Sequence, residues 1–360
     1  MNTDFLIIGG GVVGCATALA LAQTSAKVML IERGELGGES SWAGGGILFP
    51  LLPWDYREEV TRITQWSNSL YPEWVADLQT ISGIDPEYRN SGMLVLPPFD
   101  QDSASAWCGS HGVPIETVPA RSRLPLFATD SAALWLPQVA QVRNPRLLQA
   151  MRRALTLTGV HVVEHTEIIS LRPESDRITR ASTRDRDYKA GQYIVAAGAW
   201  SQPLLGELAP SVPIVPVRGQ MLLLKSEPGL LPHILLQHGI YLIPRQDGHV
   251  LVGSTLEQTG FDKSITEAAK QTLLTAATKM FPPLQQATLV RHWAGLRPGS
   301  PDNIPIISRH PRFKNLSLNS GHFRYGVTMA PASARLLANT LLGRPQSIDA
   351  SPYRWPENKA

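Results

Sequence analysis

The feature that most constrains the fold is a glycine motif close to the start of the chain, Gly9-x-Gly11-x-x-Gly14. Residues 5–8, directly before it, form a short apolar run typical of a buried parallel strand. Residues 16–22, after it, are rich in strong helix formers. A second apolar run at 28–31 ends on Glu32, 21 residues beyond Gly11. This order predicts a dinucleotide-binding unit, which consists of a strand, a glycine turn, a helix, a second strand and an acidic residue.

Each part of this unit has a physical role. Gly9 allows the tight turn, Gly11 lets the backbone approach a pyrophosphate, and Gly14 lets the helix pack closely on the strand. The N-terminus of the helix directs its free N–H groups and the positive end of its dipole toward the phosphates. The spacing of Glu32 suits a hydrogen bond to a ribose hydroxyl.

The same stretch has two competing interpretations, because residues 5–26 carry no charge. Their number matches the roughly 20 apolar residues of a transmembrane helix. The glycines at 9–11, however, would weaken such a helix. A secretion signal would carry a positive n-region, whereas the first four residues contribute only Asp4. We therefore expect a cofactor-binding turn and no membrane span.

The composition argues against several other functions. The 360 residues include 33 Lys and Arg against 30 Asp and Glu, and the basic residues are scattered, so nucleic-acid binding is not expected. The length suggests two domains or one elaborate domain. Cys15 and Cys108 provide neither a disulfide framework nor a metal-binding spacing, and the nine histidines show no H-x-x-H pairing, so we expect no metal site. The sequence shows no targeting segment, which makes the cytoplasm the expected location.

The rest of the chain divides into a mixed first part and a strand-rich second part. The first part predicts helices at 56–82 and 146–157, short strands at 162–163 and 168–169, and a buried strand at 193–200 that runs into small residues. Within it, the glycine-rich residues 40–47 indicate a loop whose backbone lies against a flat cofactor ring. From about residue 213 the pattern predicts an antiparallel sheet, with strands at 221–224, 241–243 and 250–252 and a helix at 264–280. Near the end, a strand at 316–318, a turn at 321–326 and a helix at 332–342 repeat the order of the first unit.

With these segments in place, the sequence resembles the D-amino-acid-oxidase-type family of FAD enzymes, and most closely its bacterial glycine oxidases of thiamine biosynthesis. The resemblance covers essentially the whole chain. The motifs that carry it are IIGGGVVG (7–14), ESSWAGGGIL (39–48), IVAAGAWS (194–201), PVRGQ (216–220), YLIPR (241–245), LVGST (251–255), WAGLRPGSPDNIPIIS (293–308) and GHFRYG (321–326).

The resemblance implies an α/β fold, α+β overall. In this fold an FAD-binding Rossmann-like domain is joined to a second, substrate-binding domain built on a mostly antiparallel sheet. The first domain is expected to comprise residues 1–80, 144–209 and 299–360. The second is expected to comprise residues 81–143 and 210–298.

The resemblance also implies FAD rather than NAD. Ile168 is expected at the adenine end and the segment 322–328 near the isoalloxazine. Relatives with covalent flavin use a Cys or His near the ring, and this chain has no Cys beyond 108 and no His in 39–48, so we expect non-covalent FAD. Together with the glycine motif, the expected FAD-binding residues are Gly9, Gly11, Val12, Val13, Gly14, Glu32, Arg33, Ser40, Ser41, Gly45, Gly46, Ile47, Ile168, His322, Phe323, Arg324, Tyr325, Gly326, Val327 and Thr328.

For the substrate, the family pattern puts Tyr241, Arg297 and Arg324 around an amino-acid carboxylate. Arginine suits this task because its planar fork matches a carboxylate bidentately and keeps its charge near neutral pH. Gly239 stands where a glycine oxidase can have a histidine, and Leu256 follows LVGST. We expect both to line the pocket, with Gly239 widening it and Leu256 filling it.

The expected activity is oxidation of glycine and small relatives such as sarcosine and D-alanine. Hydride passes from Cα to flavin N5, the imine is hydrolysed to an oxoacid and ammonia or amine, and oxygen reoxidises the flavin to give hydrogen peroxide. This chemistry needs little acid–base machinery, so no catalytic base is assigned. Two alternatives stay open: a dehydrogenase of the same fold that passes electrons to a quinone or protein, and a non-catalytic flavin-binding module. A homo-oligomer is compatible with the sequence.

Overall fold

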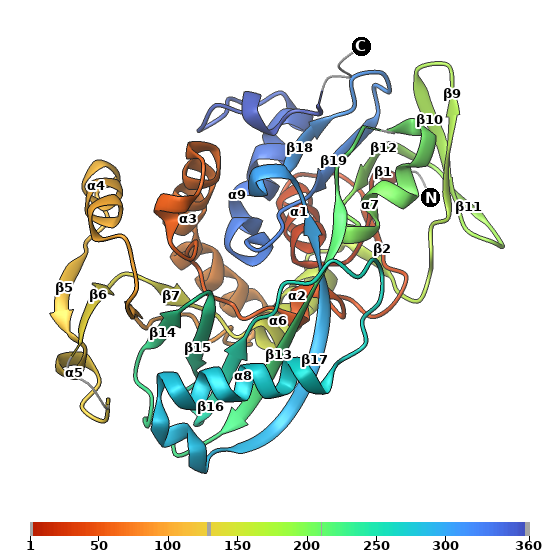
Figure 1. Ribbon diagram of the computed structural model, residues 1–360. Coiled ribbons are helices and arrows are strands. Elements are labelled where there is room, and N and C mark those ends of the chain that lie inside the picture. The colour runs from red at the N-terminus through yellow and green to blue at the C-terminus, as the bar shows by residue number, and fades with distance from the viewer. Residues whose placement is uncertain (1–2, 128–130, 210, 357–360) are drawn as a thin grey trace.

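The computed structural model of the protein describes residues 3–127, 131–209 and 211–356. Its first layer is a six-stranded sheet in the order β18-β19-β12-β1-β2-β8 (Figure 1). Neighbouring strands are parallel except at the edge, where β18 pairs antiparallel with β19. The strands are β1 (Thr3–Ile8), β2 (Val28–Ile31), β8 (His161–Val163), β12 (Ala190–Val195), β18 (Ile306–Arg309) and β19 (Leu316–Ser320).

The two faces of this sheet are buried against different layers. Phe5 and Ile7 of β1 pack in the core formed with the helices, and Leu6 and Ile8 pack in the opposite core, as the alternation of side chains along a strand requires. The helices are α1 (Val12–Ala22), α3 (Glu58–Ser82), α6 (Asn144–Leu157) and α9 (Gly326–Leu342). The opposite layer is a three-stranded antiparallel sheet of β9 (Ser170–Glu174), β10 (Arg177–Ser182) and β11 (Asp187–Tyr188).

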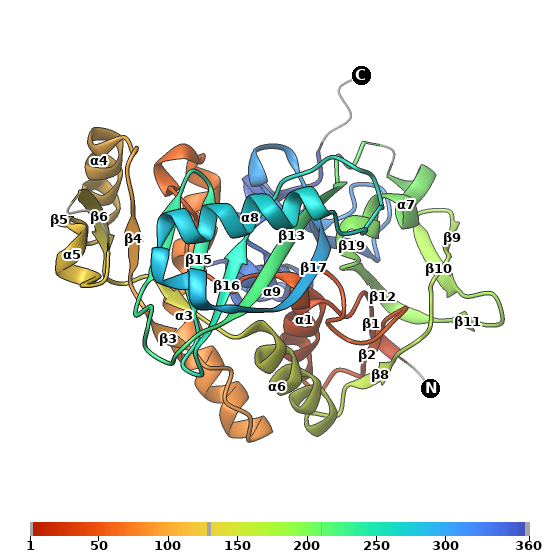
Figure 2. The ribbon, with the colours of Figure 1, turned by 60° about the horizontal axis from the view of Figure 1, so that its bottom comes forward.

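The second large sheet has eight strands in the order β17-β13-β16-β15-β14-β4-β6-β5 and is antiparallel except between β14 and β4. Helix α8 (Glu267–Met280) covers one face of it (Figure 2). Its strands are β4 (Met93–Val95), β5 (Glu116–Pro119), β6 (Ala132–Leu136), β13 (Val215–Lys225), β14 (Ile234–Gln237), β15 (Ile240–Pro244), β16 (His249–Gly253) and β17 (Thr288–Gly299).

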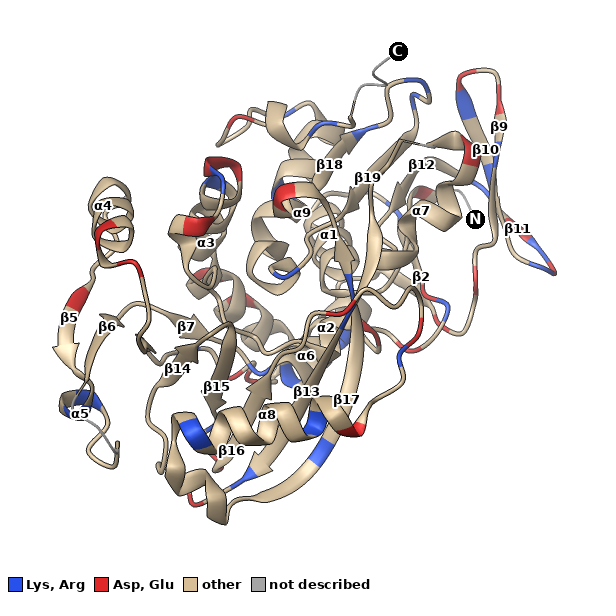
Figure 3. Cartoon of the chain, viewed as in Figure 1, with Lys and Arg blue, Asp and Glu red and all other residues tan. Residues whose placement is uncertain are grey.

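The remaining elements are short and connect these layers. They are α2 (Ser40–Ala43), α4 (Gln101–His111), α5 (Ala120–Arg123), α7 (Ser201–Leu205) and the two-stranded sheet of β3 (Arg89–Asn90) and β7 (Ala140–Gln141). Lys and Arg are spread over many elements and interspersed with Asp and Glu (Figure 3). None of the helices in the described part of the chain combines the length and apolarity needed to cross a membrane.

The two sheets match the expected α/β fold with a Rossmann-like part and a mostly antiparallel part. All strands of the six-stranded sheet fall in 1–80, 144–209 and 299–360. All strands of the eight-stranded sheet fall in 81–143 and 210–298, except that the last residue of β17, Gly299, lies one position beyond. This distribution supports these ranges, which we propose as the domain boundaries.

The strand expected at 168–169 is wrong, because the β9 ladder begins at Ser170. Ile168 is buried against the six-stranded sheet, whereas Ile169 is 50% exposed. The backbone N–H of Ile169 still donates to the Ser182 carbonyl (2.9 Å), so this segment is an irregular approach to the strand. Two consecutive apolar residues were too short a pattern to distinguish a regular strand from such an irregular segment.

Candidate active site

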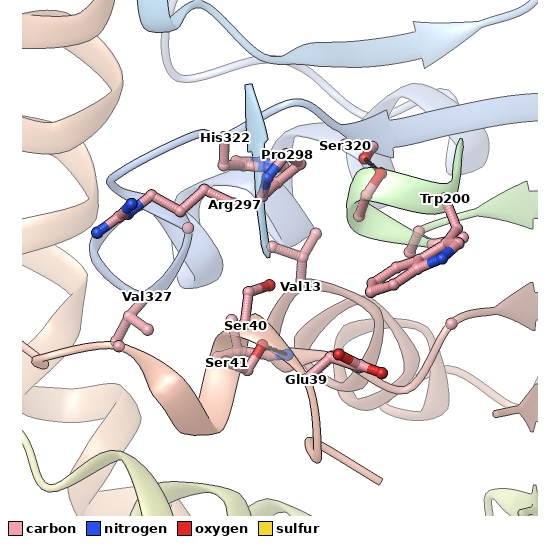
Figure 4. A pocket seen from close by; sticks show the side chains of 18 of the residues that line it. Val13, Glu39, Ser40, Ser41, Trp200, Arg297, Pro298, Ser320, His322 and Val327 are labelled. Atoms are coloured by element: carbon pink, nitrogen blue, oxygen red, sulfur yellow. Dashed lines mark hydrogen bonds between the residues drawn. The ribbon is translucent and has the colours of Figure 1, made fainter. Parts of the chain in front are cut away.

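A cavity of about 390 Å³ lies where the starts of α1, α2 and α9 meet strands of the eight-stranded sheet. In Figure 4, Glu39, Ser40 and Ser41 lie on one side of it and Pro298 and His322 on the other. Most of the residues predicted from the sequence line this cavity: Gly9, Gly11, Val12, Val13, Glu32, Arg33, Ser40, Ser41, Gly45, Gly46, Ile47, Ile168, Tyr241, Arg297, His322, Phe323, Arg324, Tyr325, Gly326, Val327 and Thr328.

The three glycines of the first motif are needed for different reasons. A Cβ on Gly14 would lie 1.9 Å from the carbonyl oxygen of Gly9, so Gly14 permits the contact between helix and turn rather than lining the cavity. Gly9 has a φ of +114°, and a Cβ there would meet the Ala196 carbonyl oxygen at 2.5 Å. A Cβ on Gly11 would meet only Ser41 Oγ, at 3.2 Å. Packing within the protein therefore explains Gly9 and Gly14, whereas at Gly11 a side chain would press on one atom, Ser41 Oγ.

The N-terminus of α1 opens onto this space. No side chain of the helix caps it, and its first turn contains no acidic residue. Ser41 Oγ accepts a hydrogen bond from the Val12 N–H (2.9 Å), which joins the start of α1 to α2. The positive end of the helix dipole is thus directed at the cavity.

Glu32 lies at the end of β2 beside the same turn and is 9% exposed. Its carboxylate accepts hydrogen bonds from the N–H groups of Gly10 (2.6 Å) and Gly34 (2.9 Å). These two bonds fix the carboxylate against the wall of the cavity. Each oxygen keeps a lone pair for a hydroxyl donor.

The glycine-rich loop after α2 is held by a buried arginine. Arg245 is 6% exposed and donates to the carbonyl oxygens of Gly45 (2.7 Å) and Val142 (2.9 Å) and to Gln141 Oε1 (2.5 Å). Burial lowers the pKa of Arg245 to about 10. The last residue of the YLIPR motif therefore anchors this loop.

The glycines of this loop contact protein atoms on the side where a side chain would begin. A Cβ on Gly46, whose φ is +79°, would lie 2.2 Å from the Val142 carbonyl oxygen. A Cβ on Gly45 would lie 2.6 Å from Ile243 Cδ1. Packing against the neighbouring segments is thus a further reason for glycine here, beside the expected approach to a cofactor ring.

A buried polar network supports the start of α9. Ser333 Oγ lies 2.7 Å from His322 Nε2 and donates to Asn319 Oδ1 (2.6 Å), while Asn319 Nδ2 donates to Thr17 Oγ1 on α1 (3.0 Å). Burial lowers the pKa of His322 to about 3, so its imidazole is neutral at neutral pH. Like α1, α9 has no side-chain cap and no acidic residue in its first turn.

Tyr241 on β15 is wedged between two glycines. A Cβ on Gly253 would lie 2.6–2.7 Å from its Cε2, Cζ and Oη atoms, and a Cβ on Gly45 would lie 3.2 Å from Cε2. The ring therefore passes between the Gly45 loop and the neighbouring strand β16 and reaches the cavity.

Two arginines line the same end of the cavity as Tyr241. Arg297 on β17 donates from Nη2 to Ser254 Oγ (2.7 Å) and from Nη1 to the Thr255 carbonyl oxygen (3.2 Å). Burial lowers its pKa, and the positive charge of Arg324 acts in the same direction. Among the ion pairs of the described residues, none involves either arginine. This end of the cavity therefore carries two arginines that form no ion pair with a described carboxylate, although the charge of Glu257 acts on Arg297 from nearby.

The partners of Arg297 belong to a loop, residues 254–266, that Arg218 anchors. Arg218 is 5% exposed, donates from Nε to Glu257 (3.1 Å) and from Nη1 to Asp262 (2.7 Å), and exchanges two backbone hydrogen bonds with Glu257. Burial raises the pKa of Glu257, but hydrogen bonds from Thr255 and Arg218 outweigh it and hold the pKa below its ordinary value. This charged network fixes the start of the loop, and with it the two acceptors of Arg297.

The far end of this loop reaches the opposite wall of the cavity. Lys263 Nζ pairs with Glu39 (3.0 Å), which also pairs with Arg33 (2.8 Å). The Arg33 guanidinium carbon lies 3.6 Å from the centroid of the Trp200 ring, and Phe261 packs beside that ring (5.6 Å). The contacts connect the second sheet to the residues around Glu32.

Two expectations about the pocket are wrong. Gly239 lies in the exposed turn between β14 and β15, and Leu256 is 53% exposed in the anchored loop; neither is among the residues that line the cavity. Conversely, Glu39, Trp200 and Ser254 line it although no role was expected for them. All three lie inside the motifs that carry the resemblance, which was the available signal. Phe49 also lines the cavity, and no pattern in the sequence marked it.

Comparisons with known proteins agree with this site. Residues 4–340 match the DAO family, described as FAD dependent oxidoreductase. The chain is 43% identical to a glycine oxidase of Pseudomonas aeruginosa over 358 residues, covering 98% of each protein. It is 31% identical to the bifunctional protein ThiO/ThiG of Trichormus variabilis, covering 95% of this chain and 53% of that protein. The crystal structure of glycine oxidase from Geobacillus kaustophilus superposes with a TM-score of 0.93 at 25% identity over all of both chains.

The family match spans the glycine motif, the residues that line the cavity and both arginines. The sequence identity to the Pseudomonas aeruginosa protein extends over nearly the whole chain. The protein therefore belongs to the DAO family of FAD-dependent oxidoreductases.

Proposed function

We propose that the protein is an amine oxidase that acts on glycine and on small relatives such as sarcosine and D-alanine. The observation that carries the proposal is the pair Arg297 and Arg324, which line the cavity beside Tyr241 and take part in none of the ion pairs of the described residues. An amino-acid carboxylate supplies the missing negative charge. The names of the relatives, glycine oxidases at 43% and 42% identity, support the same substrate class.

The cavity fits FAD on its own geometry. The start of α1, where Ser41 Oγ is the one protein atom near a Cβ on Gly11, would offer backbone N–H groups beyond that of Val12 to a pyrophosphate. Glu32, fixed by Gly10 and Gly34, would accept from a ribose hydroxyl. The uncapped start of α9 would place a second positive dipole beside the flavin ring. Cys15 and Cys108 are buried away from the cavity, which supports non-covalent binding.

The residues at the Tyr241 end would position the substrate. Arg297 uses two of its N–H groups on Ser254 and Thr255, so others remain for a bidentate contact with a carboxylate. Its orientation is fixed before the substrate arrives because both acceptors belong to the loop that Arg218 anchors. Such preorganisation reduces the entropy lost on binding.

Bound FAD supplies the acceptor for a hydride from the substrate Cα at its N5 atom, which leaves an imine for water to hydrolyse. The chain's own contribution is to bind, orient and desolvate the amino acid. His322 lines the cavity, but with a pKa of about 3 it is a poor proton acceptor. We therefore assign no catalytic base.

Oxygen as the electron acceptor, with hydrogen peroxide as product, and a role in thiamine biosynthesis are parts of the same proposal. The name of the ThiO/ThiG relative supports the second part. The proposal is tested with purified protein carrying FAD. Anaerobic addition of glycine should bleach the flavin absorbance, and admission of air should restore it with an equivalent amount of peroxide. Flavin that stays oxidised with glycine, sarcosine and D-alanine would contradict the proposal, whereas bleaching without peroxide would identify a dehydrogenase.

A further inference from the structure

A second cavity, of about 460 Å³, shares one lining residue with the first. It is bordered by α3, the end of α4 and the segments around β3 and β7. The residues lining it are Leu48, Phe49, Gln65, Asn68, Ser69, Tyr71, Tyr88, Asn90, His111, Gly112, Val113, Leu136, Gln138, Val139 and Ala140. None of the roles considered above involves this cavity.

Phe49 belongs to the linings of both cavities. It is 8% exposed. Its neighbours in the same segment divide between the cavities: Ile47 and Leu51 line the first, and Leu48 lines the second. Phe49 is held by an edge-to-face contact with Trp107 of α4, with the ring centroids 6.3 Å apart. Phe49 is therefore a buried and fixed residue that the two linings share.

The second cavity has the chemistry of a site for an uncharged, ring-bearing group. Tyr71 and Tyr88 stack at its wall, with their centroids 6.3 Å apart and their planes at 13°. His111 lines the cavity, and its Nε2 atom lies 3.0 Å from Oε2 of Glu58. Glu58 itself is not among the residues that line the cavity. The buried Oδ1 atom of Asn68 accepts no hydrogen bond from any residue that the structure describes.

We propose that Phe49 is the specificity-determining residue that restricts the enzyme to small substrates, by closing the catalytic cavity toward this second cavity. The inference rests on the proposed function, because it takes the carboxylate of the substrate to be held by Arg297 and Arg324. On this inference, the side chain of an aromatic D-amino acid held in that way needs the space that Phe49 occupies. Replacing the Phe49 side chain by a methyl group would join the two cavities and give such a side chain room beside Tyr71 and Tyr88.

The test uses the FAD-loaded protein and two variants that each truncate one buried side chain of the same segment. Phe49→Ala joins the cavities, whereas Leu48→Ala enlarges only the second. Binding is followed by the change in flavin absorbance on titration with acetate and with 3-phenylpropionate, which have the skeletons of glycine and D-phenylalanine without the amine. Turnover of glycine and D-phenylalanine is measured in parallel.

We expect Phe49→Ala to bind 3-phenylpropionate roughly tenfold more tightly or better than the unmodified protein, and to gain turnover of D-phenylalanine. Leu48→Ala should show neither gain. Equal gains in both variants, or none in Phe49→Ala while acetate still binds, would overturn the inference. Phe49→Leu, a smaller change, gives the same reading at lower amplitude if the alanine variant does not fold.

The proposed function fails in a different way. Unmodified protein that neither binds acetate nor is reduced by glycine contradicts the proposed function, and the inference with it. Normal binding of acetate with an unchanged size limit in Phe49→Ala contradicts the inference alone.

Discussion

The guanidinium of Arg297 occupies the space where a side chain at position 219 would begin. A Cβ on Gly219 of β13 would lie 2.1 Å from both Nη atoms of Arg297 and 2.3 Å from Cζ. The two strands are antiparallel neighbours, with Val217 opposite Arg297. The glycine of the PVRGQ motif is therefore explained by the arginine of the neighbouring strand.

The variant Gly219→Ala should displace Arg297 and weaken substrate binding. We expect KM for glycine to rise roughly tenfold or more, equivalent to about 1.4 kcal/mol, with little change in FAD content. Gly109→Ala is the matched control, because nothing lies within 4 Å of a Cβ at that position of α4. An unchanged KM in Gly219→Ala would show that Arg297 does not hold the substrate.

Removing Arg297 itself should act on binding rather than on stability. The loss of one charge-assisted hydrogen bond, about 1.5–3 kcal/mol, corresponds to roughly tenfold to a hundredfold in affinity for Arg297→Ala. Arg297→Lys should recover only part, because an ammonium lacks the bidentate fork. Arg245→Ala provides the contrast, since it loses three hydrogen bonds inside the protein and should lower the melting temperature. A variant Arg297→Ala with normal KM and reduced stability would reverse the assignment.

Two glycines of the first motif should respond differently to substitution. Gly11→Val should fold and lose FAD, because a side chain there meets little protein and enters the space at the start of α1. Gly14→Ala should instead destabilise the fold by about 1–3 kcal/mol, since its Cβ would collide with the Gly9 carbonyl. Flavin absorbance per polypeptide and thermal unfolding of the FAD-free proteins distinguish the two. A yellow Gly11→Val protein with full flavin content would remove this turn from the FAD site.

Stability should decrease in acid partly through His322. Its pKa is about 3 in the folded protein, from burial, against about 6.5 for an unperturbed histidine. Below pH 6.5 the unfolded chain therefore binds a proton that the folded protein does not, and stability falls by about 1.4 kcal/mol per pH unit until the pH approaches 3. His322→Gln should have a shallower decline between pH 7 and pH 5 in urea unfolding. Parallel profiles for the two proteins would contradict the buried, neutral imidazole.

FAD should leave the protein on acid or heat denaturation. Of the described residues, His322 is the histidine that lines the cavity, and its Nε2 is engaged by Ser333. Mass spectrometry of the denatured polypeptide should show no added flavin, with the flavin recovered in the supernatant. A flavin mass on the polypeptide would contradict non-covalent binding, and a matching loss in His322→Gln would locate the bond.

The sequence predicted those parts of the fold in which the signal is local. The first βαβ unit and its glycines follow from a short stretch in which period and composition change abruptly. Strands β4, β5, β6 and β14, each three to five residues long, and helix α4 were not anticipated, because short apolar runs beside prolines carry little periodicity. The order of the strands in the eight-stranded sheet depends on long-range pairing that no local pattern encodes.

The site shows the same division. The arginines and Tyr241 were found through motifs, but the place of the Gly239 turn and the exposure of Leu256 were not, because both depend on the course of a loop in the folded chain. Phe49 could not be singled out, since its importance arises from two cavities that exist only in the folded chain. Likewise, the reason for Gly219 lies on another strand, 78 residues further along.

The wedge of Tyr241 between Gly45 and Gly253 also constrains how such a protein can diverge. Gly253 can acquire a side chain only after the ring has been replaced by something smaller, because the Cβ of the new residue and the phenol would occupy the same space. A side chain at Gly45 meets Ile243 before it meets the ring. A lineage that remodels this substrate pocket at Gly253 must therefore give up the tyrosine first, and its intermediate forms have a temporarily enlarged pocket.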